Sequence, residues 1–183
     1  MIPAKPILLD IVVNPPPEEI LLDSSFIASA TIPQLEHHIE VREFIEKMIA
    51  NGTVVVYSHL TELEFWNVCL KLEVERQEGI QREKAMQHLK NNSSILKRYV
   101  KQCTKYMELF VDNMARMRAL NVQIADVVKD EEAMAKAAIY NLYTYDTLQI
   151  ATALYCDLEN IAALDKHISK KCDGLKIYTV VGT

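Results

Sequence analysis

Glycine is scarce in this chain, and no glycine-rich loop is present. Only 4 of the 183 residues are glycine, and none belongs to the closely spaced pattern that opens a P-loop or a dinucleotide-binding helix. Such loops need several glycines because a side chain would keep the backbone away from the phosphates. The sequence therefore argues against nucleotide binding of either kind.

Cysteine is equally scarce and is not arranged for metal binding. The 4 cysteines, Cys69, Cys103, Cys156 and Cys172, lie far apart and form no closely spaced pair. Zinc sites and disulfide frameworks both have recognisable cysteine spacings, so we expect neither. The better interpretation is that these residues are small apolar side chains that pack in the core.

Long apolar runs are also missing. No run approaches the roughly 20 residues that a membrane-spanning helix needs. The first six residues, Met-Ile-Pro-Ala-Lys-Pro, lack the apolar segment and cleavage site of a signal peptide, so we expect a cytoplasmic protein. Hydrophobic residues still make up 50% of the 183 residues, which is enough for one domain with a full core.

Acidic and basic residues are separated along the chain. The net charge is -5, which by itself argues against a polyanionic partner. Residues 80–118, however, hold nine Lys and Arg against three Asp and Glu, and the rest of the chain is acidic. A basic segment near an acidic site is expected where a phosphate backbone must be attracted. A solvated helix face explains the same charges equally well.

Short apolar runs alternate with segments of helical periodicity. We expect buried strands at residues 20–22, 53–57, 122–128, 160–164 and 175–181, and helices at 39–50, 130–140 and 146–156. Strands separated by helices form a parallel sheet covered on both faces. The sequence thus predicts a three-layer α/β/α domain over residues 20–183, preceded by an extended, linker-like N-terminal leader at residues 1–19.

A helical hairpin is expected as an insertion at about residues 80–118. The polar residues 91–94, Asn-Asn-Ser-Ser, are suited to end one helix and begin the next. In the second arm, apolar residues recur at spacings of three and four: Ile95, Tyr99, Cys103, Tyr106, Phe110, Met114 and Met117. This spacing puts them on one helix face, which we expect to be core or a dimer interface.

Four acidic residues lie at the ends of expected strands or in the helix turns that follow: Asp23, Glu64, Asp146 and Asp165. Each has a structural alternative. The two aspartates Asp23 and Asp146 suit the N-terminus of a helix, Asp165 suits a turn, and Thr61 with Glu64 matches a capping box. Their coincidence favours a shared site, because the ends of parallel strands meet at one sheet edge.

Several carboxylates gathered at one place would repel one another unless a cation lay between them. Mg²⁺ and Mn²⁺ are the ions that prefer carboxylate oxygen. The residues therefore favour a divalent metal site at this edge of the sheet.

The acidic residues also belong to four blocks in a recognisable order. These blocks are residues 21–25 (Leu-Leu-Asp-Ser-Ser), 58–64 (Ser-His-Leu-Thr-Glu-Leu-Glu), 146–154 (Asp-Thr-Leu-Gln-Ile-Ala-Thr-Ala-Leu) and 160–168, which contains Leu164-Asp165-Lys166. With them the chain resembles the PIN domain family, a nuclease fold found in VapC-type toxins of toxin–antitoxin pairs and in other RNA-processing proteins. The third block is the most distinctive.

The resemblance implies a PIN-like fold and a set of functional residues. Asp23, Glu64, Asp146 and Asp165 would be catalytic and would hold one or two Mg²⁺ or Mn²⁺ ions. Their neighbours Ser25, Thr61 and Thr147 would orient water or the acids. The first candidates for contact with an RNA backbone are Lys97, Arg98, Lys101 and Lys105, followed by Lys166, Lys170 and Lys171.

The chain departs from the family pattern at three places. Ser25 stands where Asn is frequent, Ala163 stands where Thr or Ser is frequent, and the helical hairpin is longer than in small family members. The expected function is a metal-dependent endoribonuclease, and the resemblance implies the toxin of a toxin–antitoxin pair as its role. The expected partners are RNA, an antitoxin and a second copy of the chain. The alternatives are a catalytically inactive PIN-fold interaction module and a DNA-directed nuclease.

Overall fold

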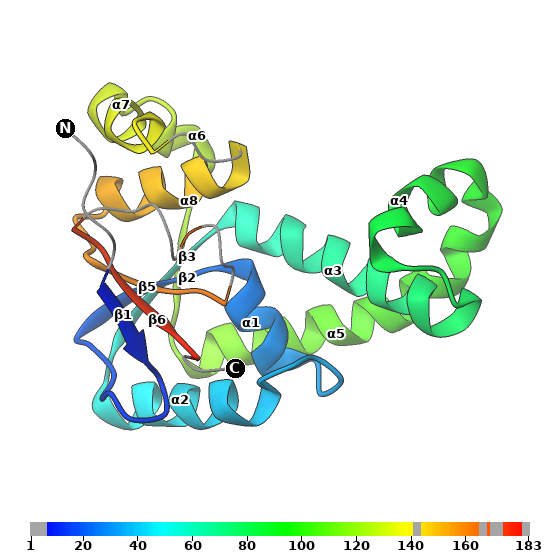
Figure 1. Ribbon diagram of the computed structural model, residues 1–183, viewed down its shortest axis with the longest axis horizontal. Coiled ribbons are helices and arrows are strands. Elements are labelled where there is room, and N and C mark those ends of the chain that lie inside the picture. The colour runs from blue at the N-terminus through cyan, green and yellow to red at the C-terminus, as the bar shows by residue number, and fades with distance from the viewer. Residues whose placement is uncertain (1–6, 141–143, 165–167, 169–173, 181–183) are drawn as a thin grey trace.

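A parallel β-sheet forms the centre of the molecule (Figure 1). The computed structural model describes residues 7–140, 144–164, 168 and 174–180. Its strands are β1 (Ile7–Asp10), β2 (Glu19–Leu22), β3 (Val54–Ser58), β4 (Leu120–Val122), β5 (Asn160–Ala162) and β6 (Lys176–Thr179). They lie in the order β1-β6-β5-β2-β3-β4, and every neighbouring pair is parallel.

Helices cover both faces of this sheet. The elements are α1 (Ser24–Thr31), α2 (His38–Asn51), α3 (His59–Glu78), α4 (Arg82–Asn91), the short 3₁₀ helix η1 (Ser93–Ile95), α5 (Leu96–Arg116), α6 (Ile124–Val127), α7 (Glu131–Ala138) and α8 (Thr144–Tyr155). One core contains α1, α2, α3 and α5, and a second contains α7 and α8. The predicted three-layer α/β/α fold is confirmed.

The strands show why two cores form. Side chains alternate across a strand, so Ile20 and Leu22 enter the core with α1 and α2, whereas Leu21 enters the core with α8. All three are fully buried. A continuous apolar run is therefore the pattern that a strand covered on both faces requires.

The strand expected at residues 122–128 is wrong for most of its length. Strand β4 ends at Val122, opposite Ser58, which is the last residue of β3. Beyond this pair the neighbouring chain has already turned into α3, so the amides of Asp126 and Val127 donate to the carbonyl of Gln123 instead. The chain turns into α6 because its backbone groups must find partners locally.

Part of the segment expected as a leader belongs to the sheet. Residues Ile7–Asp10 form β1, which pairs with β6 from Ile7–Lys176 to Asp10–Thr179. Ile11, just after the strand, is 1% exposed. This edge strand therefore adds core contacts that a linker would not make.

The long helices α3 and α5 pack side by side and, with α4, project from the body of the molecule (Figure 1). They are antiparallel, since Tyr99 near the start of α5 donates to Glu78 at the end of α3, whereas Phe110 contacts Phe65 near the start of α3. We call the projecting part, residues 70–106, the helical arm. The chain reverses at Gly79, whose φ of 67° suits glycine.

The apolar stripe of α5 is core, as expected. Tyr99, Cys103, Tyr106, Phe110 and Met114 are buried against α3 and its surroundings. Cys69 on α3 is also buried, and both Cys69 and Cys103 are free thiols. Within the described ranges, no helix combines the length and apolarity needed to cross a bilayer.

Phe110 joins α5 to the sheet and to α3, and its loss should destabilise the fold. It is 1% exposed, and its ring lies 4.9 Å from that of Phe65 and 5.8 Å from that of Tyr57. We expect Phe110→Ala to lower the free energy of unfolding by about 3–5 kcal/mol, as for other buried aromatic truncations. Urea unfolding should show this loss, whereas Leu109→Ala, at an exposed neighbour, should change stability little. Equal effects would contradict this packing.

Candidate active site

The candidate site lies where the order of the strands reverses. From β2 the chain proceeds to β3 and β4 on one side, and it then returns to β5 on the other side of β2. Ligand crevices of open parallel sheets lie outside the carboxyl ends of the strands at such a point. Asp23 is the first residue after β2.

Asp23 is held rigidly at this point. Its side chain is 5% exposed, and its backbone amide donates to the carbonyl of Ala162 in β5 over 2.9 Å. One carboxylate oxygen, Oδ2, accepts from the amide and the hydroxyl of Ser25, at 2.9 and 2.5 Å. Asp23 is thus the N-cap of α1, which is the structural alternative that the sequence offered for this residue.

Ser25 connects the two strand ends. Its hydroxyl donates to Asp23 and accepts from the backbone amide of Leu164 at 3.0 Å. The residue that departs from the family pattern therefore orients the Asp23 carboxylate directly.

Glu64 is not part of a capping box. Helix α3 begins at His59 with Ser58 as its N-cap, so Thr61 lies inside the helix rather than at its start. Burial, followed by the negative charge of Asp23, raises the pKa of Glu64 to about 7. A hydrogen bond with Ser24 opposes this rise, and the charge of Asp146 adds to it.

Three acids from distant parts of the chain therefore act on one another. Asp23 follows β2, Glu64 lies in α3, and Asp146 lies half-buried in the first turn of α8. Thr147 is its half-buried neighbour. Asp165, Lys166, Lys170 and Lys171 lie outside the described residues.

A buried polar network next to Glu64 joins four elements, α8, α3, β3 and β2. The side-chain amide of Gln149 in α8 donates to Thr61 Oγ1 at 3.1 Å, and the Ser58 hydroxyl donates to Gln149 Oε1 at 3.4 Å. Thr61 also donates to the carbonyl of Leu22 at the end of β2. The predicted positioning role of Thr61 would act through this network, which fixes α3 and α8 against β2.

Sequence reasoning missed two residues of this site, Ser24 and Gln149. Both side chains hydrogen-bond to Glu64. Gln149 is 1% exposed within the apolar helix α8. A buried side-chain amide must have a hydrogen-bond partner. The single glutamine within this apolar segment was therefore a signal in the sequence for a residue of the site.

The chemistry of the acids fits a hydrated divalent cation. Carboxylate oxygen is the donor type that Mg²⁺ and Mn²⁺ prefer. Burial raises the pKa of Glu64 most, the charges of Asp23 and Asp146 raise it further, and a cation would relieve the part due to these charges. Among the described residues, no three His, Cys, Asp or Glu side chains are arranged as a ready ligand set. Mg²⁺ requires fewer, because it commonly binds through one or two carboxylates and retains several waters.

The basic residues proposed to contact RNA lie along the helical arm. Lys97, Arg98, Lys101 and Lys105 are all exposed. With 3.6 residues per turn, the three lysines occupy the side of α5 away from its buried stripe. Arg98 forms an ion pair with Glu78 at 3.3 Å.

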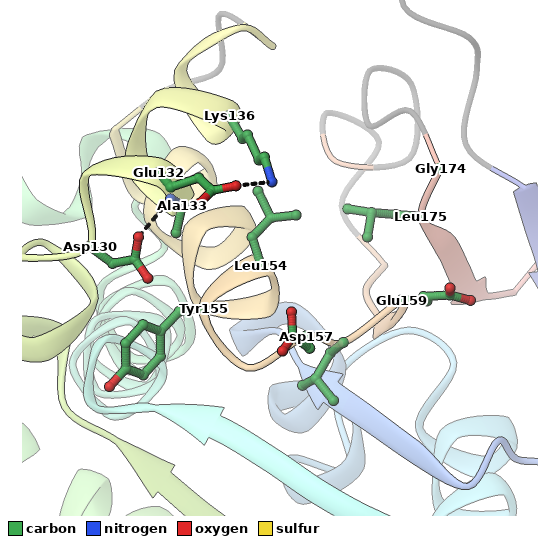
Figure 2. Close-up of a pocket in the computed structure, with 11 residues that line it drawn as sticks. Asp130, Glu132, Ala133, Lys136, Leu154, Tyr155, Asp157, Glu159, Gly174 and Leu175 are labelled. Carbon is green, nitrogen blue, oxygen red and sulfur yellow. Dashed lines mark hydrogen bonds and ion pairs between the residues drawn. The ribbon is translucent and has the colours of Figure 1, made fainter.

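A separate surface cavity lies at the opposite edge of the sheet (Figure 2). It is lined by Asp130, Tyr155 and Asp157, near the end of α8 and the start of β5, and by Lys136, which forms an ion pair with Glu132 at 2.6 Å. The amino ends of the strands are not where open parallel sheets bind ligands. This cavity is therefore distinct from the acidic site.

A comparison with models of protein families agrees with this architecture. A family model described as PIN domain matches residues 20–174. A search of curated proteins gave no match. Among solved structures, the VapC20 toxin of Mycobacterium tuberculosis, described as cleaving the sarcin–ricin loop, is similar over 82% of this chain and 92% of that chain. The two are 14% identical in sequence, with a TM-score of 0.47.

The raised pKa of Glu64 predicts a pH-dependent stability in metal-free buffer. Between about pH 4.5 and pH 7 the folded chain binds more protons at Glu64 than the unfolded chain does, so this carboxyl makes folding less favourable as pH rises. We expect Glu64→Gln to stabilise the chain at pH 8 by about 1–2 kcal/mol, with allowance for solvent screening, and to do so much less at pH 4.

Urea unfolding at both pH values with a chelator present would measure this difference. Glu108→Gln, on the exposed side of α5, is the matched control and should leave the pH dependence unchanged. A stabilisation by Glu64→Gln that is the same at pH 4 and pH 8 would show that the carboxylate charge is not its cause.

Proposed function

The chain belongs to the PIN domain family, whose model matches most of its length, and on this premise we propose that it is a divalent-metal-dependent endoribonuclease. One observation carries the proposal: Asp23, Glu64 and Asp146 come from three distant elements and interact at the carboxyl edge of the sheet. The charges of Asp23 and Asp146 add to the effect of burial in raising the pKa of Glu64, and a purely structural role would not require acids to be gathered in this way.

The proposed chemistry is hydrolysis of a phosphodiester bond. A bound Mg²⁺ or Mn²⁺ would supply an activated water and neutralise charge on the phosphoryl group. Asp23 would be a fixed ligand, because Ser25 holds its carboxylate in one orientation. Glu64 and Asp146 would complete the described part of the ligand set, and Asp165 is proposed as the fourth acid.

The basic residues of the arm support RNA as the substrate. Lys97, Arg98, Lys101 and Lys105 are exposed on a segment that projects from the body, where they would attract a phosphate backbone to an otherwise acidic protein. The toxin role, the antitoxin, the homodimer and the cytoplasmic location remain proposals that follow from family membership and sequence.

Cleavage of RNA with and without the metal tests the activity. We expect the native chain to cleave RNA with Mn²⁺ or Mg²⁺ and to lose cleavage with a chelator. Asp146→Asn should lower the rate by roughly 10²-fold or more, which is the usual loss when a charge-stabilising group is removed from an active site.

Asp157→Asn is the matched control for this substitution. Asp157 is exposed and follows α8 at its opposite end, and its φ of 54° is a conformation that Asn accepts. This variant should cleave as the native chain does. Absent native cleavage, or equal rates in both variants, would favour the inactive interaction module. Preferential cleavage of DNA of the same sequence would favour the DNA-directed nuclease.

A further inference from the structure

Lys71 lies on the same face of α3 as the acidic site. It follows Glu64 by seven residues within one continuous helix, and seven residues are close to two full turns. The two side chains therefore leave the helix in nearly the same direction, about 10 Å apart along its axis at 1.5 Å per residue. Helix α3 leaves the sheet edge and runs out into the arm (Figure 1).

Lys71 has no acidic partner among the described residues. It is half-buried, so its position is restricted more than that of a fully exposed lysine. Glu75, one turn further along α3, is the natural partner at this spacing. Glu75 instead pairs with Arg82 at 2.5 Å, and none of the ion pairs found in the described ranges includes Lys71.

The lysines of α5 are placed differently. They lie on the side of α5 that faces away from α3, whereas Lys71 shares the face of Glu64. An RNA strand that passes over the acids and continues along α3 reaches Lys71 before it reaches the lysines of α5. Lys71 precedes the basic segment at residues 80–118, so the charge pattern of the sequence gives no sign of it.

We propose that Lys71 holds one phosphate of the RNA strand beyond the bond that is cut. Its position about 10 Å from Glu64 along α3 places this phosphate outside the one that reacts. A half-buried lysine is suited to this role, because its stem packs on the helix while its ammonium group reaches the surface. The inference deepens the proposed ribonuclease function and rests on it.

Substrate length tests this assignment. We would compare an RNA of about twenty nucleotides with a dinucleotide, whose one phosphate is the one that is cut. Lys71→Ala should lower kcat/KM for the long RNA about fivefold, the effect of one exposed charge pair, with most of the change in KM. The short RNA should be cleaved at the native rate, and Lys71→Arg should retain most of the activity on the long RNA.

Binding provides a readout that does not depend on cleavage. Fluorescence anisotropy of the long RNA with a chelator present gives the dependence of affinity on salt. We expect Lys71→Ala to reduce the slope of log K against log salt by about 0.7, the value for one phosphate contact on a single strand. Lys136→Ala, on α7 near the opposite edge of the sheet, should leave the slope and both cleavage rates unchanged.

The outcomes separate this inference from the proposed function. An unchanged salt slope, or an equal loss of kcat/KM on the short and the long RNA, would overturn the role of Lys71. Native protein that cleaves neither RNA, while Lys71→Ala still reduces the salt slope, would overturn the ribonuclease and leave the RNA contact standing.

Discussion

The parallel pairing of β2 with β5 is the constraint on which the acidic site depends. Leu22 lies opposite Ala162 in this register, and the next residue, Asp23, continues the pairing through its amide. Ser25 then bonds both to Asp23 and to the backbone after β5. Two chain segments about 140 residues apart therefore meet at one point, and the carboxylate of Asp23 has no freedom to turn away from it.

Helix positions explain how the fold tolerates three acids in one place. Asp23 caps α1, and Asp146 lies in the first turn of α8. Helix N-termini carry partial positive charge, which stabilises carboxylates there. Glu64 is the sixth residue of α3, beyond the first turn, where this effect has faded. Burial raises its pKa most, and the charges of Asp23 and Asp146 raise it further. A cation would relieve the part of the rise that comes from these two charges.

Features that depend on local periodicity were predicted correctly from the sequence, whereas features that depend on long-range strand pairing were not. The buried strand at residues 20–22 and the apolar stripe of α5 were predicted correctly, because burial on two faces or one face leaves a periodic pattern. The strand expected at residues 122–128 was wrong, because β3 ends at Ser58 and gives β4 no further partner. Pairing of this kind is long-range and leaves no local signal. The edge strand β1 was missed for the same reason.

The sequence alone determined that strands and helices alternate, that their apolar faces need cover on both sides, and that acids follow the strands. Only the tertiary structure decided which acids interact and what holds them: Ser24 and Gln149 against Glu64, and Ser25 against Asp23. It also turned the lysines of α5 away from α3, the helix that carries Glu64 and Lys71. The physical reason is that periodicity fixes the direction of a side chain within its own helix, whereas packing fixes how helices are rotated about one another.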